Sequence, residues 1–440
     1  MIERLDVFGG SPRLFKLYTQ LCFCFALKPS DFVTRNLVVE YIENGRARLA
    51  DRVPWVSDEV IQDEDGSFSI VESGRWPSVI VKDLEDELPG IDHYSRSAFP
   101  FALLDEDLIA PCKTLPRDFD KPAPILTLQL NFIKGGLLLV INGQHNCMDL
   151  RGQSQIIYLL SKACRGDVLT DNEVTSACLP RESAIPVLTE HQVPSVGIPP
   201  KQPCVPPAAS PSEKAIWAYF LFSSEAMSSL KAAAGETNTT PFISTDDVLS
   251  ALVWQSVTRT RTHRLHSATE KESTFERQVD VRKHLGIPEA YPGNVVHKTS
   301  VHLPLSTVVS SPLGVIASAL REPLLQPENI ELQVRTAVTR LHESLPTQRT
   351  TVPPPRQPIP STDIKMSSWA KEACHDFDFG GFLGRAEAIR RPSFEGWEGL
   401  AYMMPRTLSG EIAVALCLRP EDLEALKRDR EFARWGRYVG

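Results

Sequence analysis

The residues that could do chemistry include a histidine and an aspartate four positions apart, His145 and Asp149. Histidine is the usual general base because its pKa lies close to neutral pH. The bare His-x-x-x-Asp pattern is a weak signal, since a chain of this composition often contains it by chance. The local residues leave two interpretations open: either His145 is a catalytic base, or both side chains only cap and satisfy the corner on which they lie.

The segments on either side of this motif predict a strand-to-helix corner. Residues 126–132 alternate apolar with polar side chains, which is typical of a half-buried strand. Lys134-Gly135-Gly136 predicts a tight turn before a returning strand at 137–141. Beyond Asp149, residues 152–165 predict a helix with Ile156, Ile157, Leu160 and Ala163 on one face. Such corners often carry functional side chains.

Length and composition predict a soluble globular protein of two domains. The chain has 440 residues, is 42% hydrophobic and carries a net charge of −8. We expect a mixed α/β (α+β) fold with an N-terminal domain at 1–177, a proline-rich crossover linker at 178–212 and a C-terminal domain at 213–440. No basic stripe with interleaved aromatic residues occurs, so nucleic acid is not an expected partner.

The nine cysteines are scattered and include no C-x-x-C pair. This distribution argues against a disulfide framework and against a metal site, and it fits a reducing compartment. Cys147 lies beside His145, and we interpret it as a buried thiol rather than a nucleophile. Because no export signal and no membrane span are recognised, we expect a cytoplasmic protein.

Apolar periodicity and capping residues predict the remaining elements. Strands are expected at 17–27, 79–84, 215–222, 275–281, 295–303 and 411–418. One helix is expected to be capped by Ser30-Asp31, to run to about Ala50 and to bury Leu37 among others. Ser244 and Asp247 form a predicted capping box for a second helix. Further helices are expected at 227–234 and 420–432.

Three more motifs follow in the second half of the chain. They are Val279-Asp280-Val281-Arg282, Tyr291-Pro292-Gly293-Asn294, and Ser367-Ser368-Trp369 followed by Asp376-Phe377-Asp378-Phe379-Gly380. With these motifs in this order, the chain resembles the BAHD acyltransferase superfamily and, within it, the fungal trichothecene 3-O-acetyltransferase group. The resemblance runs from end to end. It includes residues 130–144 (LNFIKGGLLLVINGQ), 244–252 (STDDVLSAL), 366–371 (MSSWAK) and 390–394 (RRPSF).

The resemblance implies a fold and a role for each motif residue. It implies two halves like those of chloramphenicol acetyltransferase, with a channel between them. His145 matches the general base, and Asp149 matches an aspartate that points away from the substrate and pairs with Arg282. Ser367 and Trp369 match positions near the reacting carbonyl that can help to stabilise an oxyanion.

Asp378 matches the aspartate of the family's Asp-Phe-Gly-Trp-Gly motif, which has a structural role. This chain departs from that motif, because Gly381-Phe382 stands where Trp-Gly is expected. The departure weakens any expectation about contacts between this loop and the acyl donor.

The implied function is CoA-dependent O-acyl transfer by a monomer. Acyl-CoA, with acetyl-CoA favoured, is the expected co-substrate, and no bound cofactor or metal is expected. The expected acceptor is a hydroxyl of a small hydrophobic fungal-type metabolite, with a trichothecene-like alcohol as the nearest guess.

Two alternatives are retained. A condensation-domain-like enzyme would take its donor from a carrier protein, but such enzymes show a second histidine and a glycine where this chain has Gln144 and Leu150. A non-catalytic descendant that binds a metabolite or templates a cyclisation is supported only by the altered pair at 381–382.

Overall fold

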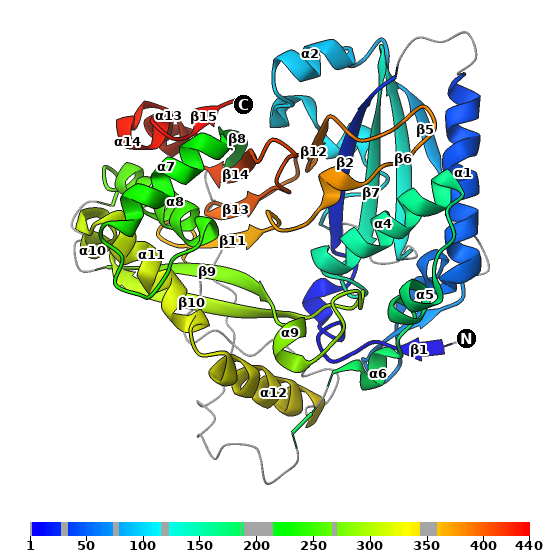
Figure 1. The fold of residues 1–440 in the computed structure, drawn as a ribbon, viewed down its shortest axis with the longest axis horizontal. Helices are drawn as coiled ribbons and strands as arrows, with labels where there is room; N and C mark the ends of the chain where they lie inside the picture. The colour runs from blue at the N-terminus through cyan, green and yellow to red at the C-terminus, as the bar shows by residue number, and fades with distance from the viewer. Residues whose placement is uncertain are drawn as a thin grey trace.

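Two halves, each built around a mixed β-sheet, make up the computed structural model (Figure 1). The structure describes residues 2–27, 34–73, 79–115, 123–185, 187–188, 214–265, 271–343 and 359–440. This two-halved mixed α/β architecture confirms the predicted fold class. No helix in these ranges is long and apolar enough to cross a membrane.

The N-terminal half holds a five-stranded sheet in the order β12-β2-β7-β6-β5. Only β5 and β6 are parallel neighbours. The predicted hairpin is confirmed, with Gly135 at a φ of 74° in its two-residue turn. The strands are β12 (Ala388–Arg390), β2 (Tyr18–Ala26), β7 (Gly136–Gln144), β6 (Leu126–Ile133) and β5 (Ile80–Asp83).

Both faces of this sheet are buried, because the side chains of β2 and β7 alternate between two hydrophobic clusters. Phe23 and Phe25 pack in the cluster that includes α1 (Arg35–Arg52) and α4 (Leu150–Arg165). Cys22 and Cys24 pack on the other face, with α2 (Ile91–Arg96) and α3 (Glu106–Ile109). A strand buried on both faces explains why residues 137–141 are apolar without interruption.

A seven-stranded sheet in the order β10-β9-β11-β13-β14-β8-β15 forms the C-terminal half. Strands β9, β11 and β13 run parallel, and the other neighbours are antiparallel. The strands are β10 (Val296–Pro304), β9 (Glu272–Asp280), β11 (Ile364–Ser368), β13 (Leu400–Met403), β14 (Ile412–Leu418), β8 (Ile216–Phe222) and β15 (Arg437–Tyr438).

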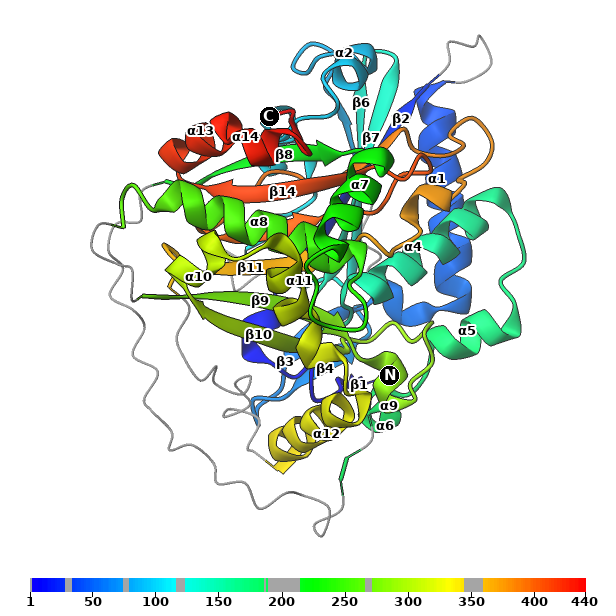
Figure 2. The same cartoon turned by 60° about the vertical axis from the view of Figure 1, so that its left-hand side comes forward.

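Helices cover one face of this sheet (Figure 2). Among them, α8 (Thr245–Arg261) is buried along most of its length, and it begins with the predicted capping box of Ser244 and Asp247. The others are α7 (Ser224–Gly235), α10 (Leu305–Ser310), α11 (Leu313–Arg321), α13 (Pro420–Arg428) and α14 (Arg430–Ala433).

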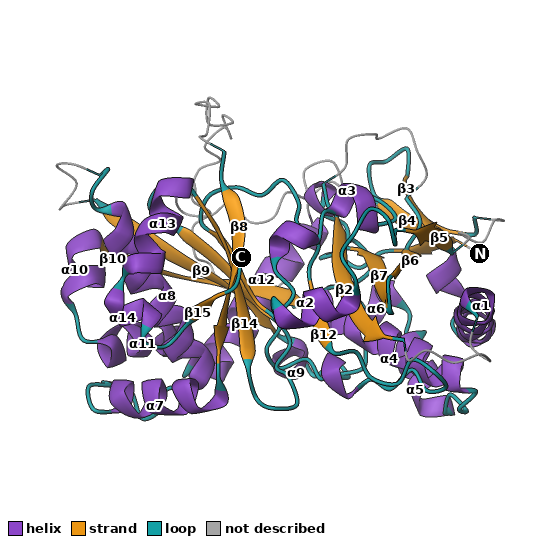
Figure 3. Ribbon diagram, turned by 90° about the horizontal axis from the view of Figure 1, so that it is seen from above, coloured by secondary structure: helices purple, strands orange, loops and turns teal. Residues whose placement is uncertain are grey.

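The opposite face of the seven-stranded sheet packs against the N-terminal half (Figure 3). On β8, Phe220 belongs to the cluster with α8, whereas Tyr219 and Leu221 belong to the core of the N-terminal half. On β14, Ala413 and Ala415 face that core in the same way. Small alanines at this position allow the two halves to approach closely, so they share one hydrophobic core.

One segment of the C-terminal sequence belongs to the other half. Strand β12 pairs with β2 and becomes an edge of the five-stranded sheet, although it lies within the predicted C-terminal domain, 213–440. The strand β12 therefore lies in the C-terminal part of the sequence but belongs to the sheet of the N-terminal half. The predicted domain boundaries otherwise stay predictions.

Several local predictions are wrong. Helix α1 begins at Arg35 with Thr34 as its N-cap, so it starts later than predicted, and Leu37 lies on its exposed side. Ser30 and Asp31 lie outside the described residues. The start of the predicted linker, 178–212, forms α6 (Arg181–Ala184), a single turn that fits between Pro180 and Pro186. Residues 189–212 of the linker fall outside the described part of the chain.

The expected C-terminal helix at 420–432 is broken in two. Asp429 has extended backbone angles, and its side chain accepts a hydrogen bond from the Phe432 N–H to cap α14.

A small sheet of three short strands was not predicted from the sequence. It consists of β1 (Ile2–Arg4), β4 (Phe68–Val71) and β3 (Glu59–Gln62). The remaining helices are α5 (Asp171–Ala177), α9 (Arg282–Leu285) and α12 (Pro327–Glu343).

Candidate active site

His145 lies in the turn that follows β7, where the two halves meet. Its backbone N–H donates to the Leu17 carbonyl at 2.8 Å, just before β2 begins. The preceding residue, Gln144, donates from its backbone to Ile125 at 2.9 Å. These bonds to both neighbouring strands fix the backbone that carries the imidazole, and the side chain stays partly exposed.

Burial lowers the pKa of His145 below the ordinary value of 6.5. Its own backbone carbonyl and Asp149 raise that pKa, whereas the charges of Arg391 and Lys365 lower it further. Asn294 adds a polar contact, with its Nδ2 3.4 Å from the imidazole Nδ1 and 3.3 Å from the His145 carbonyl oxygen. The imidazole is therefore held neutral near pH 7, which is the state that a general base needs.

Asp149 is the N-cap of α4, and both of its carboxylate oxygens are occupied. Oδ1 accepts from the Gly152 N–H at 2.8 Å and from Arg282 Nη2 at 2.9 Å. Oδ2 accepts from the Val295 N–H at 2.9 Å. With its hydrogen bonds directed at α4 and at the C-terminal half, Asp149 fixes the corner after His145 rather than offering a free carboxylate.

Arg282 is only 1% exposed in its side chain and joins three segments of the chain. In addition to Asp149, its guanidinium donates to Asp280 Oδ1 at 3.0 Å, to the Tyr291 carbonyl at 3.0 Å and to the Gly293 carbonyl at 2.6 Å. Asp149 and Asp280 raise the pKa of Arg282 despite its burial. The structure thus brings Asp149 and Arg282 into contact and holds the 291–295 loop against the histidine corner.

Gly152, in the first turn of α4, packs directly against the 291–295 loop. A Cβ at this position would lie 1.8 Å from the Pro292 carbonyl oxygen. We expect Gly152→Ala to push this loop away from Asp149 and to destabilise the protein by roughly 1–3 kcal/mol. Thermal unfolding measures this effect. Gly235→Ala is the matched control, because nothing lies within 4 Å of a Cβ there and alanine favours its helix. Equal melting temperatures for the two variants would contradict this account.

Ser367 and Trp369 lie on the side of the seven-stranded sheet that faces the N-terminal half. Ile364 and Met366 of β11 pack under α8, so the alternate residues, Lys365 and Ser367, point the other way. Trp369 follows the same alternation, belongs to the core of the N-terminal half and packs on the Tyr402 ring at 4.9 Å. Within the described residues, the Ser367 hydroxyl has no hydrogen-bond partner, so it can donate to a ligand.

Asp378 lies far from this centre. Its carbonyl accepts a hydrogen bond from Arg165, the last residue of α4, whereas Asp149 caps the first turn of that helix. The helix has 16 residues and is therefore about 24 Å long. The Asp378 carboxylate accepts from the Gly380 N–H at 2.7 Å, and the Phe379 ring packs edge-on against Phe23 and Phe25. Asp378 thus shapes a loop and does not meet His145.

The altered pair after Gly380 is accommodated by the same loop. Gly380 and Gly381 both have positive φ angles, 66° and 54°. A Cβ on Gly380 would meet Arg165 at 2.4 Å, so glycine is required there. Phe382 packs on the Tyr41 ring at 5.1 Å and so joins the N-terminal half.

Cys147 cannot act as the nucleophile. Its side chain is fully buried, and burial raises the pKa of its thiol to about 12. In the described ranges of the chain, no group of three or more histidine, cysteine, aspartate or glutamate side chains could hold a metal ion.

A cavity of about 260 Å³ lies on the Lys365 side of β11. Arg13, from the N-terminal half, faces Lys298 of β10 and Lys365 across it. The lining also holds three carboxylates: Glu276 of β9 lies 3.5 Å from Lys298 and 3.8 Å from Lys365, and Asp363 and Glu398 also line the cavity. Glu398 is already paired with Arg261, Arg264 and Arg419, so the cations Arg13, Lys298 and Lys365 outnumber the carboxylates that remain, which suits a ligand with phosphate groups.

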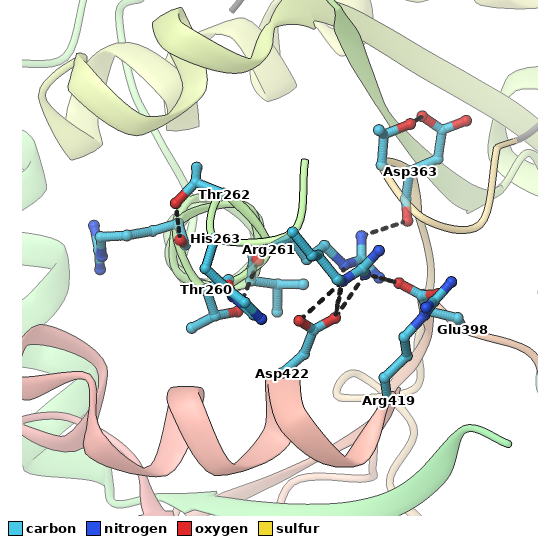
Figure 4. Close-up of polar contacts among 12 residues, drawn as sticks. Thr260, Arg261, Thr262, His263, Asp363, Glu398, Arg419 and Asp422 are labelled. Atoms are coloured by element: carbon cyan, nitrogen blue, oxygen red, sulfur yellow. Dashed lines mark hydrogen bonds and ion pairs between the residues drawn. The ribbon is translucent and has the colours of Figure 1, made fainter. Parts of the chain in front are cut away.

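A buried network of ion pairs fixes one wall of this cavity (Figure 4). Arg261 is fully buried at the end of α8 and donates to the Asp363 carbonyl at 3.1 Å. It also lies 3.3 Å from Glu398 and 3.8 Å from Asp422. Because Asp363 and Glu398 line the cavity, the network ties the start of β11 to α8 and α13.

Three residues of this site were given no role from the sequence, namely Asn294, Lys365 and Arg391. Asn294 and Arg391 lie inside the motifs YPGN and RRPSF, and Lys365 directly precedes the MSSWAK segment. They lie near His145 because the two halves pack against each other, and local sequence motifs do not show how the two halves pack.

Comparison with known proteins identifies the class to which this fold and site belong. The family model described as "Trichothecene 3-O-acetyltransferase-like N-terminal domain" matches residues 17–164, and the model described as "Transferase family" matches residues 108–433. The chain therefore belongs to the Transferase family, the BAHD acyltransferases, and is an acyltransferase enzyme.

Within this family, the chain is similar to fungal O-acetyltransferases. It is 40% identical to the O-acetyltransferase dmxR13 of Cryptosporiopsis sp., over 99% of this chain and 97% of that protein. It is 38% identical, at the same coverage, to the trichothecene 3-O-acetyltransferase TRI101 of Fusarium sporotrichioides. The crystal structure of F. graminearum TRI101 complexed with coenzyme A and deoxynivalenol covers all of both chains, with a TM-score of 0.90 and 37% identity.

Proposed function

We propose that this protein transfers an acyl group, in particular acetyl, from CoA directly to a hydroxyl of a fungal-type secondary metabolite, with His145 as the general base. The observation that carries this proposal is the imidazole of His145, which backbone hydrogen bonds hold at the junction of the two halves, together with Ser367 and Trp369 on the sheet face that is turned to this junction. The trichothecene 3-O-acetyltransferase structures that contain coenzyme A and a toxin support the same donor and the same class of acceptor.

In the proposed reaction, His145 accepts the hydroxyl proton while the hydroxyl oxygen attacks the thioester carbonyl. The carbonyl oxygen then carries a negative charge, which Ser367 and the Trp369 indole N–H would stabilise. Collapse breaks the carbon–sulfur bond, and the imidazolium returns its proton to the departing thiolate. Asp149 and Arg282 hold the corner, and Asp378 shapes the loop at the far end of α4.

This mechanism predicts an acid limb in the pH profile of kcat/KM. Only neutral His145 can accept the proton, so activity falls as the pH drops through its pKa. Since burial lowers this pKa, we expect the midpoint of the limb below 6.5 and a plateau at neutral pH. Initial rates between pH 4.5 and 8 measure it. A limb centred above 6.5 would contradict the assignment of His145 as the base.

We further propose that acyl-CoA enters through the cationic cavity beside β11. Lys365 lies two residues before Ser367 on the same face of the strand, so a donor bound there leads towards the reacting centre. The positive charges of Arg13, Lys298 and Lys365 match the diphosphate and 3′-phosphate of CoA.

Neutralising Lys298 tests this entry route. We expect Lys298→Gln to raise KM for acetyl-CoA by about 3- to 10-fold with little change in kcat, because an exposed phosphate contact contributes about 1 kcal/mol. The KM effect should weaken in high salt. Lys231→Gln, on α7 and away from this cavity, is the control. An unchanged KM for acetyl-CoA in Lys298→Gln would exclude this cavity as the donor site.

The function itself is tested by incubating the protein with acetyl-CoA and a panel of hydroxylated fungal metabolites that includes trichothecenes. We expect acceptor-dependent release of CoA thiol and a product heavier by one acetyl group. If only a carrier-bound acyl donor gives product, the condensation-type alternative holds instead.

We also propose that the protein works in a reducing, cytoplasmic compartment. The free thiols of all eight described cysteines support this proposal.

A further inference from the structure

Arg391, directly after β12, is a buried cation enclosed by aromatic rings. It is 3% exposed. Its guanidinium carbon lies 4.4 Å from the ring centre of Phe394, 4.8 Å from Tyr402 and 5.6 Å from Trp369. Aromatic faces stabilise a guanidinium, but they do not neutralise its charge. Arg391 therefore brings a positive charge into the core beside Trp369.

Hydrogen bonds satisfy this guanidinium only in part. Nη2 donates to the Thr114 hydroxyl at 3.4 Å, whereas Nε has no partner in the structure as described. No carboxylate of the described residues forms an ion pair with Arg391. Glu106 accepts a hydrogen bond from the Thr114 N–H at 2.7 Å and none from Arg391; burial raises the pKa of Glu106, whereas the nearby charge of Arg391 lowers it. A buried cation without a direct counter-ion is costly, and such groups are common where a reaction develops negative charge.

Arg391 is connected to the candidate centre in two ways. Its ring partners Trp369 and Tyr402 are both neighbours of Ser367. Trp369 lies two residues after Ser367 in the chain, and Tyr402 of β13 is paired with Ser367 of β11. Its charge also reaches the imidazole of His145, where it lowers the pKa. The other charges acting on His145 are Asp149, which raises its pKa, and Lys365, which lowers it.

We infer that Arg391 is the fixed positive charge of the active centre, which holds Trp369 in place and stabilises the oxyanion that forms when the hydroxyl attacks the thioester. This inference rests on the proposed acyl transfer and adds a positioning residue to it. Arg391 contacts Trp369 directly, whereas it acts on His145 only through its electric field.

The neighbouring Arg390 provides a matched control. It is 4% exposed and lies over aromatic rings as well, at 5.2 Å from Tyr219 and 5.9 Å from Phe99. Its N–H groups donate to the backbone carbonyls of Phe99, Ile389 and Ala98. Arg390 is not among the main causes of the shift in the pKa of His145. The two arginines are adjacent in the chain and equally buried. They differ in that only Arg391 contacts Trp369 and is a main cause of the shift in the pKa of His145.

The experiment compares Arg391→Met, Arg391→Lys and Arg390→Met in the full-length protein. It measures kcat, KM for acetyl-CoA, the pH profile and the titration of the histidines by NMR. In Arg391→Met we expect kcat to fall about 10- to 100-fold, less than the roughly 10²- to 10³-fold loss on removing a direct oxyanion donor, with KM nearly unchanged. The acid limb and the His145 titration should move to higher pH. Arg390→Met should leave both where they are.

Arg391→Lys separates charge from ring stacking and serves if the methionine variant does not fold. A lysine keeps the charge but does not stack as a planar guanidinium does, so we expect the wild-type acid limb with a reduced kcat. The inference is overturned if Arg391→Met shifts neither kcat nor the His145 titration and only lowers the melting temperature, or if Arg391→Lys has the wild-type kcat. If the wild-type protein transfers no acyl group, the proposed function fails, whereas the NMR titrations still decide whether Arg391 acts on His145.

Discussion

Replacing His145 with alanine is expected to reduce acyl transfer by about 10²- to 10⁴-fold, because a positioned general base contributes that much to rate. The variant should remain folded, since the His145 backbone N–H still donates to Leu17 and the side chain is only partly buried. Product formation from acetyl-CoA and an accepted alcohol, measured together with the melting temperature, checks both statements. Turnover within a few-fold of the wild type would contradict the proposed mechanism.

Cys147→Ala is the control on the same turn. Its buried thiol packs in the core, and its raised pKa keeps it protonated. We expect a modest loss of stability from the small cavity and a kcat close to that of the wild type. Loss of activity in a folded Cys147→Ala variant, with His145→Ala still active, would reverse the roles of the two residues.

Asp149→Asn is expected to cause the largest loss of stability. The substitution keeps the size of the side chain and an N-cap oxygen, but it removes the negative charge that faces the buried guanidinium of Arg282. Removing one partner of a buried ion pair typically costs 3–5 kcal/mol. The melting temperature should fall clearly, and kcat should fall with it because the corner that holds His145 loosens. Thermal unfolding and initial rates measure the two effects.

Asp280→Asn provides the matched comparison, because Asp280 pairs with the same guanidinium at 3.0 Å but is 46% exposed in its side chain. Exposed pairs contribute about 0–1 kcal/mol, so its melting temperature should stay close to that of the wild type. If both variants lost equal stability, burial would not explain the importance of the Asp149 pair.

The strands and helices that position His145 were predictable because each follows a strong local pattern. The alternation over 126–132, the Lys134-Gly135 turn and the apolar face of α4 are all contained in short windows of sequence. The elements that were missed or misplaced are short or depend on tertiary contacts. Strands β1, β3 and β4 have at most four residues each, and the break at Asp429 depends on a cap that competes with a continuous helix.

The site was predictable only where a motif pointed to it. His145 and Asp149 were found from their spacing, and Arg282 was found through the family resemblance. Arg391 could not be connected to them, since 246 positions separate it from His145 and only the path of β12 into the other half closes that distance. Asn294 and Lys365 reach the histidine corner through the docking of the two sheets.

The position of β12 has a consequence for how the molecule can be divided. A cut in the 178–212 segment would separate the sequence into two polypeptides, but the larger one would still supply the edge strand of its neighbour's sheet and carry Arg391 beside it. The cluster that contains Phe23, Tyr219 and Ala413 would be divided between the two polypeptides, whereas the cluster around α8 would stay within the larger one. Co-expressed fragments would have to fold on each other, as in split-protein complementation, so the halves of this acyltransferase are not exchangeable modules.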